Sequence, residues 1–298
     1  MGRKRMDLSV VIVNYNSGDQ LGRCLDAIQE SRYPEPFEVV VVDNHSTDRS
    51  AVLNGGSRAR LIVQPENQGF ARAANHGIAS TKSELILILG PDVILSRGTL
   101  GEMVRTMRSR PEIGALGPVI REKPGGEHDH LRPFPSNRGL LKETLFLDRV
   151  FEDRPSAVGW LHGCCLLLRR AAIDDVGPFD PSFFLYYEDV DLCYRMGRSA
   201  WRTTIERGCA VDHISGNRDA RYGEEKLRWY HASLIEFYRK HYSRQSLRTL
   251  RRILILRSVL RLGLWISLYL IAPSRRDARG ERIRGYASVL RTLLNGAK

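Results

Sequence analysis

The sequence predicts an α/β protein with a mostly parallel central sheet and flanking helices. Short apolar, β-branched runs alternate with helix-like patterns from Leu8 to Leu89. This alternation is typical of parallel strands joined by crossover helices. The chain has 298 residues, of which 42% are hydrophobic and 27% are charged. That composition is globular and allows one large or two modest cores.

Four strands and three helices are predicted in this first region. The strands are short apolar runs, namely Leu8–Val13, Glu38–Asp43, Arg60–Val63 and Glu84–Leu89. The helices carry apolar residues at helical spacing or begin at a capping serine, namely Ser17–Ser31, Ser46–Leu53 and Phe70–Ser80. Residues 120–156 are rich in Gly and Pro and predict loops, after which Val158–Arg169 returns to strand character. The His-Asp-His run at 128–130 could hold a metal, but its Gly/Pro-rich context favours a surface loop.

Polar residues follow each of the four predicted strands. They are Asn14, Tyr15 and Asn16, then Asp43 and Asn44, then Asn67 and Gly69, and finally Asp92. Ligands of parallel sheets bind beyond the carboxyl ends of the strands, so this pattern predicts a nucleotide pocket. The alternative is that these residues only cap helices and form turns. The absence of GxGxxG and GxxxxGK[ST] disfavours a dinucleotide dehydrogenase and a P-loop phosphotransferase.

Three carboxylates fall within four positions of an otherwise apolar and aromatic stretch, FFLYYEDVDLCYR. They are Glu188, Asp189 and Asp191. Acids grouped beside apolar residues repel one another and lose hydration, which costs free energy. The pattern is therefore typical of a base or a metal ligand at a pocket wall. A capped helix start with solvated acids is the alternative.

Cysteine usage and the N-terminus predict a cytoplasmic protein. The five cysteines are odd in number and show no CxxC spacing, which favours reduced, buried thiols over a zinc site. The basic N-terminal segment has no apolar stretch of signal-peptide length before its first charged residues.

The net charge of +12 is concentrated in a C-terminal tail. Residues 244–298 contain 13 Lys or Arg and 2 Asp or Glu, whereas residues 1–243 are almost neutral. This distribution disfavours nucleic acid as a partner and favours an anionic membrane surface. The change in charge separates residues 1–243 from the tail at 244–298.

The tail is predicted to lie on a membrane. Its uncharged core, Leu262–Ala272, is only 11 residues long, about 16 Å as a helix and too short for a bilayer. Arg279–Leu294 carries an apolar stripe with arginines around it, the pattern of a basic amphipathic helix. The expected location is peripheral, on the cytoplasmic face of the inner membrane. The alternatives are a stripe that packs on the body or on a second copy in a homodimer, and a single transmembrane segment.

Six sequence blocks resemble the GT-A glycosyltransferases of the large inverting family 2, especially its rhamnosyltransferase-like branch. The blocks are VVIVNYN (10–16), VVVVDNHSTDRS (39–50), ENQGFARAANHGI (66–78), ILILGPDV (86–93), the run 159–195 and VDHISG (211–216). They occur in the family's order over residues 8–216. The resemblance implies a GT-A fold and a nucleotide-sugar donor. It also implies a nucleotide-sugar-binding half at 1–119 and an acceptor-binding half at 120–243, followed by the tail at 244–298.

The resemblance also implies roles for individual residues on the donor side. Asp92 would hold Mg²⁺ or Mn²⁺ against the donor diphosphate, and His213 would complete the metal shell. Gly90 departs from the Asp or Asn that the family usually has at this position, where the side chain helps to hold the ribose. Asp43 would recognise the base. The other implied donor-binding residues are Asn14, Tyr15, Asn16, Asn67, Gly69 and Asn75.

The resemblance also implies roles for the residues that bind and activate the acceptor. Asp189 would be the base that takes the proton of the acceptor hydroxyl. Glu188 and Asp191 would orient Asp189 or the acceptor, and Arg195 would neutralise this cluster or touch phosphate. Trp160, His162 and Gly163 would line the acceptor.

The implied reaction is transfer of L-rhamnose from dTDP-rhamnose to a cell-surface polysaccharide or its lipid-linked precursor. A UDP-hexose or galactofuranosyl transferase of the same fold is an alternative. A non-catalytic GT-A-like scaffold that binds glycans is another, supported only by the departure at Gly90.

Overall fold

The computed structural model describes residues 6–51, 59–122, 126–129, 131–147, 159–214, 223–271 and 276–295. The chain divides into two compact units. Unit 1 comprises Met1–Phe134, Pro155–Phe184 and Glu188–Gly216, and unit 2 comprises Pro135–Arg154, Leu185–Tyr187 and Asn217–Lys298.

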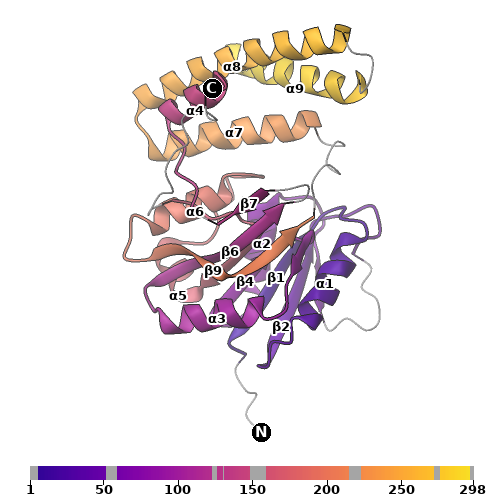
Figure 1. Cartoon of the computed structure of the whole chain (residues 1–298), viewed down its shortest axis with the longest axis vertical. Coiled ribbons are helices and arrows are strands. Elements are labelled where there is room, and N and C mark those ends of the chain that lie inside the picture. Colours follow the sequence, from indigo (N-terminus) through magenta and orange to yellow (C-terminus); the bar gives the residue numbers. More distant parts are fainter. Residues whose placement is uncertain are drawn as a thin grey trace. The chain divides into compact units, whose positions relative to one another are not determined.

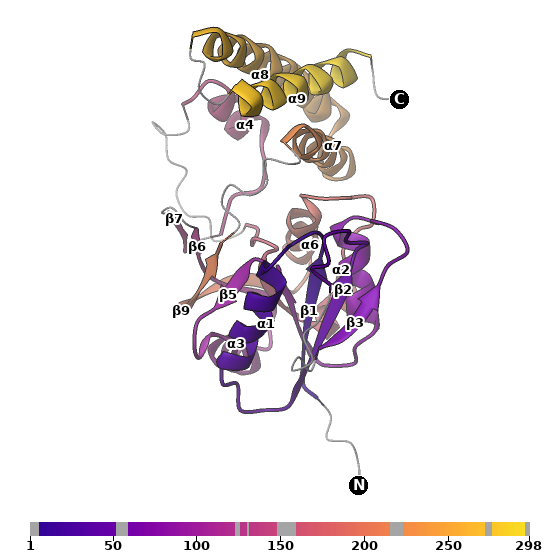
Figure 2. The same ribbon diagram turned by 90° about the vertical axis from the view of Figure 1, so that its right-hand side faces the viewer.

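Unit 1 is built on one mixed sheet of nine strands within the described residues, which confirms the α/β prediction (Figures 1 and 2). The strand order is β3-β2-β1-β4-β8-β6-β9-β5, with β7 paired to β6. Neighbours among the first four of these strands are parallel, and β8 runs antiparallel to both β4 and β6. The strands are β1 (Leu8–Asn14), β2 (Phe37–Asp43), β3 (Arg60–Val63), β4 (Leu85–Leu89), β5 (Val93–Leu95), β6 (Ile113–Glu122), β7 (Gly126–His128), β8 (Cys165–Arg169) and β9 (Arg202–His213).

Helices cover both faces of this sheet. Alternate residues of β1 point to opposite faces, so Val10 and Ile12 pack with α1 (Gln20–Glu30) and α3 (Thr99–Ser109). Val11 and Val13 pack on the other face. The helices there are α2 (Phe70–Ala79), α5 (Arg170–Val176) and α6 (Glu188–Met196). Both faces of β4 are therefore buried, as its continuous apolar sequence predicts.

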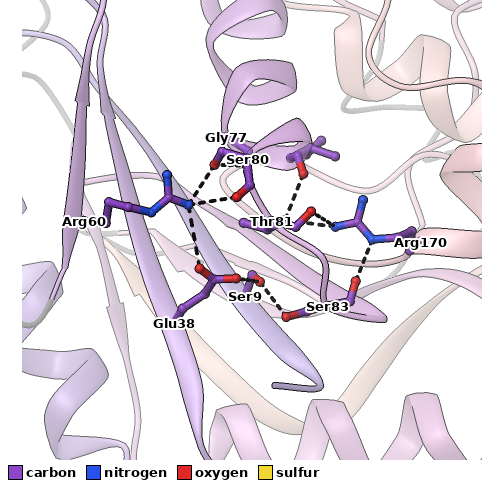
Figure 3. Close-up of polar contacts among 9 residues, drawn as sticks. Ser9, Glu38, Arg60, Gly77, Ser80, Thr81, Ser83 and Arg170 are labelled. Atoms are coloured by element: carbon purple, nitrogen blue, oxygen red, sulfur yellow. Dashed lines mark hydrogen bonds and ion pairs between the residues drawn. The ribbon is translucent and has the colours of Figure 1, made fainter. Parts of the chain in front are cut away.

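The amino-terminal edge of the parallel strands is polar, but its groups bond to one another (Figure 3). The hydroxyl of Ser9 lies 2.8 Å from a carboxylate oxygen of Glu38 and 2.7 Å from the hydroxyl of Ser83. Arg60 donates to the carbonyl and the hydroxyl of Ser80, both at 3.0 Å. This network joins β1, β2 and β3 to the loop before β4. Its role is structural, which leaves the opposite edge for the site.

Two predictions about the loops after β1 and β2 are wrong. Helix α1 begins at Gln20 with Asp19 at the N-cap position, and the hydroxyl of Ser17 donates instead to Oδ1 of Asn14. Residues 46–51 form turns and no helix, and residues 52 and 53 lie outside the described residues. Positive φ angles at His45 (69°) and Arg49 (63°) are incompatible with a right-handed helix.

The predictions for the middle of the chain hold only in part. Of the described residues in the predicted strand Val158–Arg169, only Cys165–Arg169 form β8. Residues 159–164 form a loop that includes an isolated bridge between Trp160 and Arg132. The run at 128–130 lies partly in β7, and its last residue is outside the described residues. All five cysteines are free thiols; Cys24, Cys165 and Cys193 are buried as predicted, whereas Cys164 and Cys209 are half-buried.

Unit 2 is a helical bundle of α4 (Asn137–Thr144), α7 (Gly223–His241), α8 (Arg244–Ile271) and α9 (Arg276–Leu294) (Figure 1). Its core includes Leu234, Phe237, Tyr238, Leu250 and Leu254, all fully buried. The helix predicted over Arg279–Leu294 is confirmed. Part of its apolar stripe packs inward, because Tyr286 and Val289 are buried against the bundle.

Helix α8 is longer than the sequence pattern indicated. It has 28 residues, and an 18-residue window has a mean hydropathy of 1.7. Among the described residues it is the one helix long and apolar enough to cross a membrane by length and composition. Arg257 lies in its middle and pairs with Glu143 of α4 at 2.6 Å.

Candidate active site

The ends of β1 and β2 carry a buried amide–carboxylate pair. The parallel register places Asn14 beside Asp43, and Nδ2 of Asn14 donates to Oδ1 of Asp43 at 2.9 Å. Oδ2 of Asp43 accepts from the backbone N–H of Ser46, whose hydroxyl accepts from the N–H of Asn16. Asn16 has a φ of 50° and Tyr15 is exposed beside it. The two loops after these strands therefore form one edge with a defined shape.

Asn44 extends this edge to β3, although sequence reasoning placed it among the polar strand-end residues without giving it an individual role. Its Nδ2 donates to Oδ1 of Asn67 at 2.8 Å and to the carbonyl of Gly69 at 3.2 Å. Its Oδ1 accepts from the N–H of Gln68 at 3.0 Å. Its position in the sequence could have indicated this role, because a buried amide directly after a strand needs hydrogen-bond partners from a neighbouring loop.

Gly69 and Asn75 tie α2 to the segment that precedes α6. Gly69 has a φ of 82°, and a Cβ at this position would lie 2.4 Å from the carbonyl oxygen of Phe184. That carbonyl accepts from the N–H of Phe70 at 2.7 Å. The side-chain amide of Asn75 bonds to both the carbonyl and the N–H of Phe179, at 2.7 and 3.1 Å. Asn75 was predicted to bind the donor, but its side-chain amide bonds to backbone. It therefore holds α2 against the loop that contains Phe179.

Asp92 lies after β4, on the loop that leads into β5. One of its carboxylate oxygens is 3.2 Å from Nε2 of His213, because Val93 and His213 are paired across β5 and β9. Burial lowers the pKa of His213, but the hydrogen bond and charge of Asp92 outweigh burial and raise it overall. A Cβ at Gly90 would lie 2.7 Å from Oδ1 of Asp92. The missing side chain at Gly90 therefore leaves room for the Asp92 carboxylate.

The acidic cluster begins α6, and all three acids are buried. Oδ2 of Asp189 accepts from the N–H of Gly163 at 2.7 Å, and Oδ1 accepts from the N–H of Val190 at 2.8 Å. Burial raises the pKa of Asp189 to about 6, although these N–H donors lower it. Burial and the charge of Asp189 raise the pKa of Glu188 well above its usual value. Oε2 of Glu188 has no hydrogen-bond partner within the described ranges.

Asp191 is neutralised by Arg195, four residues further along α6. Nε of Arg195 donates to Oδ2 of Asp191 at 2.8 Å. The rest of the guanidinium donates to the carbonyls of Val176, Gly177 and Pro178. Arg195 therefore fixes the loop after α5 and compensates a fully buried carboxylate. Of its two predicted roles, these contacts match neutralisation of the cluster.

Trp160, His162 and Gly163 connect the two charged groups. His162 accepts from the N–H of Cys164 through Nδ1 at 3.2 Å, and its ring centroid lies 5.7 Å from that of His213. The ring of Trp160 lies 6.3 Å from that of His162, and its Nε1–H donates to the carbonyl of Pro133. The contacts thus run from Asp189 through Gly163 and His162 to His213 and Asp92.

The fold is that of the GT-A class of glycosyltransferases. A family model described as glycosyl transferase family 2 matches residues 9–177, more than half of the chain. The chain belongs to glycosyl transferase family 2.

Two relatives and one solved structure are similar to this chain. An N-acetylglucosaminyl-diphospho-decaprenol L-rhamnosyltransferase of Mycobacterium tuberculosis is 31% identical and covers 84% of this chain and 91% of its own length. The rhamnosyltransferase WbbL of Escherichia coli is 21% identical over 76% of this chain and 91% of its own. The solved structure of a mannosyltransferase from Pyrobaculum calidifontis, in complex with GDP-Man and Mn²⁺, covers 96% of this chain and 87% of its own at 18% identity. Its TM-score of 0.57 shows the same fold.

Proposed function

We propose that this enzyme transfers L-rhamnose from dTDP-rhamnose to a lipid-linked glycan acceptor, with inversion at the anomeric carbon. The observation that carries the proposal is the buried Asp189, held by the N–H of Gly163 and connected through His162 to the Asp92–His213 pair. The rhamnosyltransferase relatives support the sugar, and the decaprenol in the name of the mycobacterial relative supports the lipid.

The donor is assigned to the carboxyl ends of β1 to β4. Asp43 recognises the base, with Asn14, Tyr15 and Asn16 beside it, and Asn67 and Gly69 shape the ribose and phosphate side. The Asn14–Asp43 and Asn44–Asn67 hydrogen bonds support this assignment because they fix the edge before a ligand arrives. Asn75 supports this edge indirectly, because its bonds to Phe179 hold α2 in position.

A divalent cation, Mg²⁺ or Mn²⁺, fits Asp92 and His213. A carboxylate oxygen and an imidazole nitrogen 3.2 Å apart are part of a ligand set, and donor phosphates supply oxygens for the rest. Within the described ranges no group of three His, Cys, Asp or Glu side chains could hold a metal on its own. The Mn²⁺ in the mannosyltransferase complex supports a metal of this kind. When bound, such an ion neutralises charge on the departing nucleoside diphosphate.

Asp189 is the base of the reaction. A sugar hydroxyl is a weak nucleophile near neutral pH, so a carboxylate must accept its proton as the new bond forms. A pKa of about 6 leaves Asp189 mostly ionised at pH 7 and basic enough to accept that proton. A single displacement requires only this one base, unlike the paired carboxylates of glycosidases.

The neighbours of Asp189 position it and the acceptor. The backbone N–H of Gly163 orients the carboxylate, and the Asp191–Arg195 pair holds α6 against the loop after α5. Glu188 has a raised pKa and is therefore suited to donate a hydrogen bond to the acceptor while protonated. Trp160 and His162 line the acceptor side.

We assign the enzyme to the cytoplasmic face of the inner membrane, as a peripheral protein, and the proposed lipid-linked acceptor supports this location. A UDP-hexose or galactofuranosyl transferase would use the same groups and differ in the sugar. The site does not support a non-catalytic scaffold. Asp92 lies beside His213, and Asp189 is buried and held by the N–H of Gly163.

The test is release of nucleoside diphosphate by the purified protein. The protein is given a lipid-linked acceptor in detergent and a panel of dTDP, UDP and GDP sugars, with Mg²⁺ or with EDTA. The proposal predicts metal-dependent release from dTDP-rhamnose. Release from a UDP sugar alone would establish the alternative donor. Absence of both donor binding and release would contradict an enzymatic role.

A further inference from the structure

Unit 2 exposes apolar side chains on one helix and at the end of another. On α8 they include Leu256, Val259, Leu260, Leu264, Leu270 and Ile271, the last being 79% exposed. At the end of α4 they are Leu141, Leu145, Phe146 and Leu147, of which Phe146 is 52% exposed. The guanidinium of Arg261 lies 4.1 Å from the centroid of the Phe146 ring, which joins the two groups. We call these ten residues and Arg261 the α4–α8 face.

The contacts on the inner side of α8 disfavour a span of the bilayer by this helix alone. Arg257 is buried there and pairs with Glu143 of α4 at 2.6 Å, and Asn137 of α4 bonds to Ser246. Arg282 of α9 also stacks on Trp265 of α8 at 4.9 Å. A spanning α8 would have to take these charged helices into hydrocarbon or lose its packing on them, and both are costly.

The outer side of α8 has the dimensions of an interfacial helix. Leu256, Val259 and Leu260 recur with Leu270 and Ile271 at helical spacing over about 22 Å. The preceding turns of the same side carry the exposed Arg248 and Arg252. An apolar stripe next to arginines is the pattern of a helix that lies at the headgroup boundary.

We propose that the α4–α8 face inserts into the surface of an anionic lipid bilayer, with α8 in the plane of the membrane and the end of α4 as a second wedge. Residues 145–147 and 256–271 enter the acyl boundary, and the arginines of α8 and α9 contact lipid phosphates. The sequence predicted that the apolar stripe of α9 contacts the membrane, but its residues Tyr286 and Val289 pack inward. The proposed contact is therefore made by the α4–α8 face instead.

Charge favours lipid over a second copy of the chain. Residues 244–298 carry 13 basic and 2 acidic residues, so a symmetric dimer through this face would bring two strongly basic surfaces together. An anionic bilayer instead attracts those charges, by about 1 kcal/mol for each Lys or Arg near the surface. The proposed lipid-linked acceptor supplies the reason for such a contact, but the contact itself requires no substrate.

The test is co-sedimentation of the full chain with phosphatidylcholine vesicles, with and without phosphatidylglycerol, in the absence of donor and acceptor. Two double variants remove one part of the face each, Phe146→Ser/Leu147→Ser and Leu270→Ser/Ile271→Ser. Each is expected to weaken binding to the anionic vesicles by about tenfold or more. Arg248→Gln/Arg252→Gln should weaken binding at low salt, and this loss should shrink as added salt screens the charges.

Matched controls come from unit 1. Leu61→Ser/Val63→Ser alters exposed apolar residues of β3, and Arg23→Gln/Arg72→Gln removes exposed charges from α1 and α2. Both should bind vesicles like the unaltered protein. Circular dichroism and sugar transfer in detergent show whether each variant is folded and active, which separates this proposal from the enzymatic one.

Three results would overturn the proposal. The unaltered protein could fail to bind anionic vesicles, or the two apolar double variants could bind as well as the controls. The third result is a concentration-dependent dimer, measured by sedimentation equilibrium, that these variants dissociate, because a second copy would then cover the face.

Discussion

Three acids within four residues of α6 have three different environments. Asp191 is paired with Arg195, Asp189 accepts two backbone N–H groups, and one oxygen of Glu188 has no partner within the described ranges. The sequence shows that the acids are clustered but does not show this division, since the partners come from segments far away in the chain. The division separates the Asp191–Arg195 ion pair from Asp189, the proposed base.

The acid limb of the pH profile should report the Glu188–Asp189 carboxyl pair. Burial raises the pKa of Asp189 to about 6, and a base acts only when it is ionised. We therefore expect kcat/KM to rise with pH up to about 6 and to level off above it. Initial rates of nucleoside diphosphate release from about pH 5 to pH 8 check this. A limb that ends near the ordinary aspartate value would show that Asp189 is not the base.

Asp92→Asn should remove the metal dependence of donor binding. The substitution keeps the shape of the side chain but weakens a hard oxygen ligand, so donor affinity in Mg²⁺ should fall about 10- to 100-fold. Calorimetry with dTDP, in Mg²⁺ and in EDTA, measures this effect. Asp26→Asn on the exposed side of α1 is the matched control. Equal loss of affinity with and without metal would contradict the metal site at Asp92.

At the scale of elements, the start of α2 depends on a residue without a side chain. Gly69→Ala would place a Cβ 2.4 Å from the carbonyl of Phe184, at a φ of 82° that L-residues rarely adopt. We expect it to lower the free energy of unfolding by about 2 kcal/mol or more and to weaken donor binding. Urea denaturation measures the first effect.

Gly22→Ala is the control for that experiment. Gly22 lies within α1 without a positive φ, and a Cβ there meets no atom within 4 Å. Alanine should therefore be neutral or stabilising by about 0.5–1 kcal/mol. If both variants lost the same stability, the close approach of Phe184 would not be the reason for glycine at 69.

Elements with a strong local pattern were predictable, and those that depend on distant partners were not. The strands β1 to β4 and the helices α2 and α9 follow from apolar runs and periodicity. The predicted helix over 46–53 failed within its described residues because Ser46 bonds to Asn14 and Asn16 instead of capping a helix. The candidate site followed from strand ends and from the resemblance, whereas Asn44 and the contact between Asp189 and Gly163 required the fold.

At the scale of the whole molecule, the proposed site residues and the excess of basic residues lie in different units. Unit 1 holds every residue proposed for donor, metal and base. The strongly basic residues 244–298 all belong to unit 2. The sequence located the basic residues in 244–298, but unit 2 also contains residues 135–154, 185–187 and 217–243, and the division at 119 and 243 stays a prediction. The sequence did not show which apolar residues remain exposed, because exposure on α8 depends on how α4 and α9 pack against it.

The measurement that tests the central claim most directly is sugar transfer by Asp189→Asn in Mg²⁺, with dTDP-rhamnose and a detergent-solubilised lipid-linked acceptor. Asp174→Asn, an exposed acid on α5, is the matched control, and thermal unfolding confirms that both variants are folded. The account predicts that Asp189→Asn loses about 10²- to 10⁴-fold in kcat while donor affinity changes little. Transfer by Asp189→Asn at the rate of the control would contradict the account.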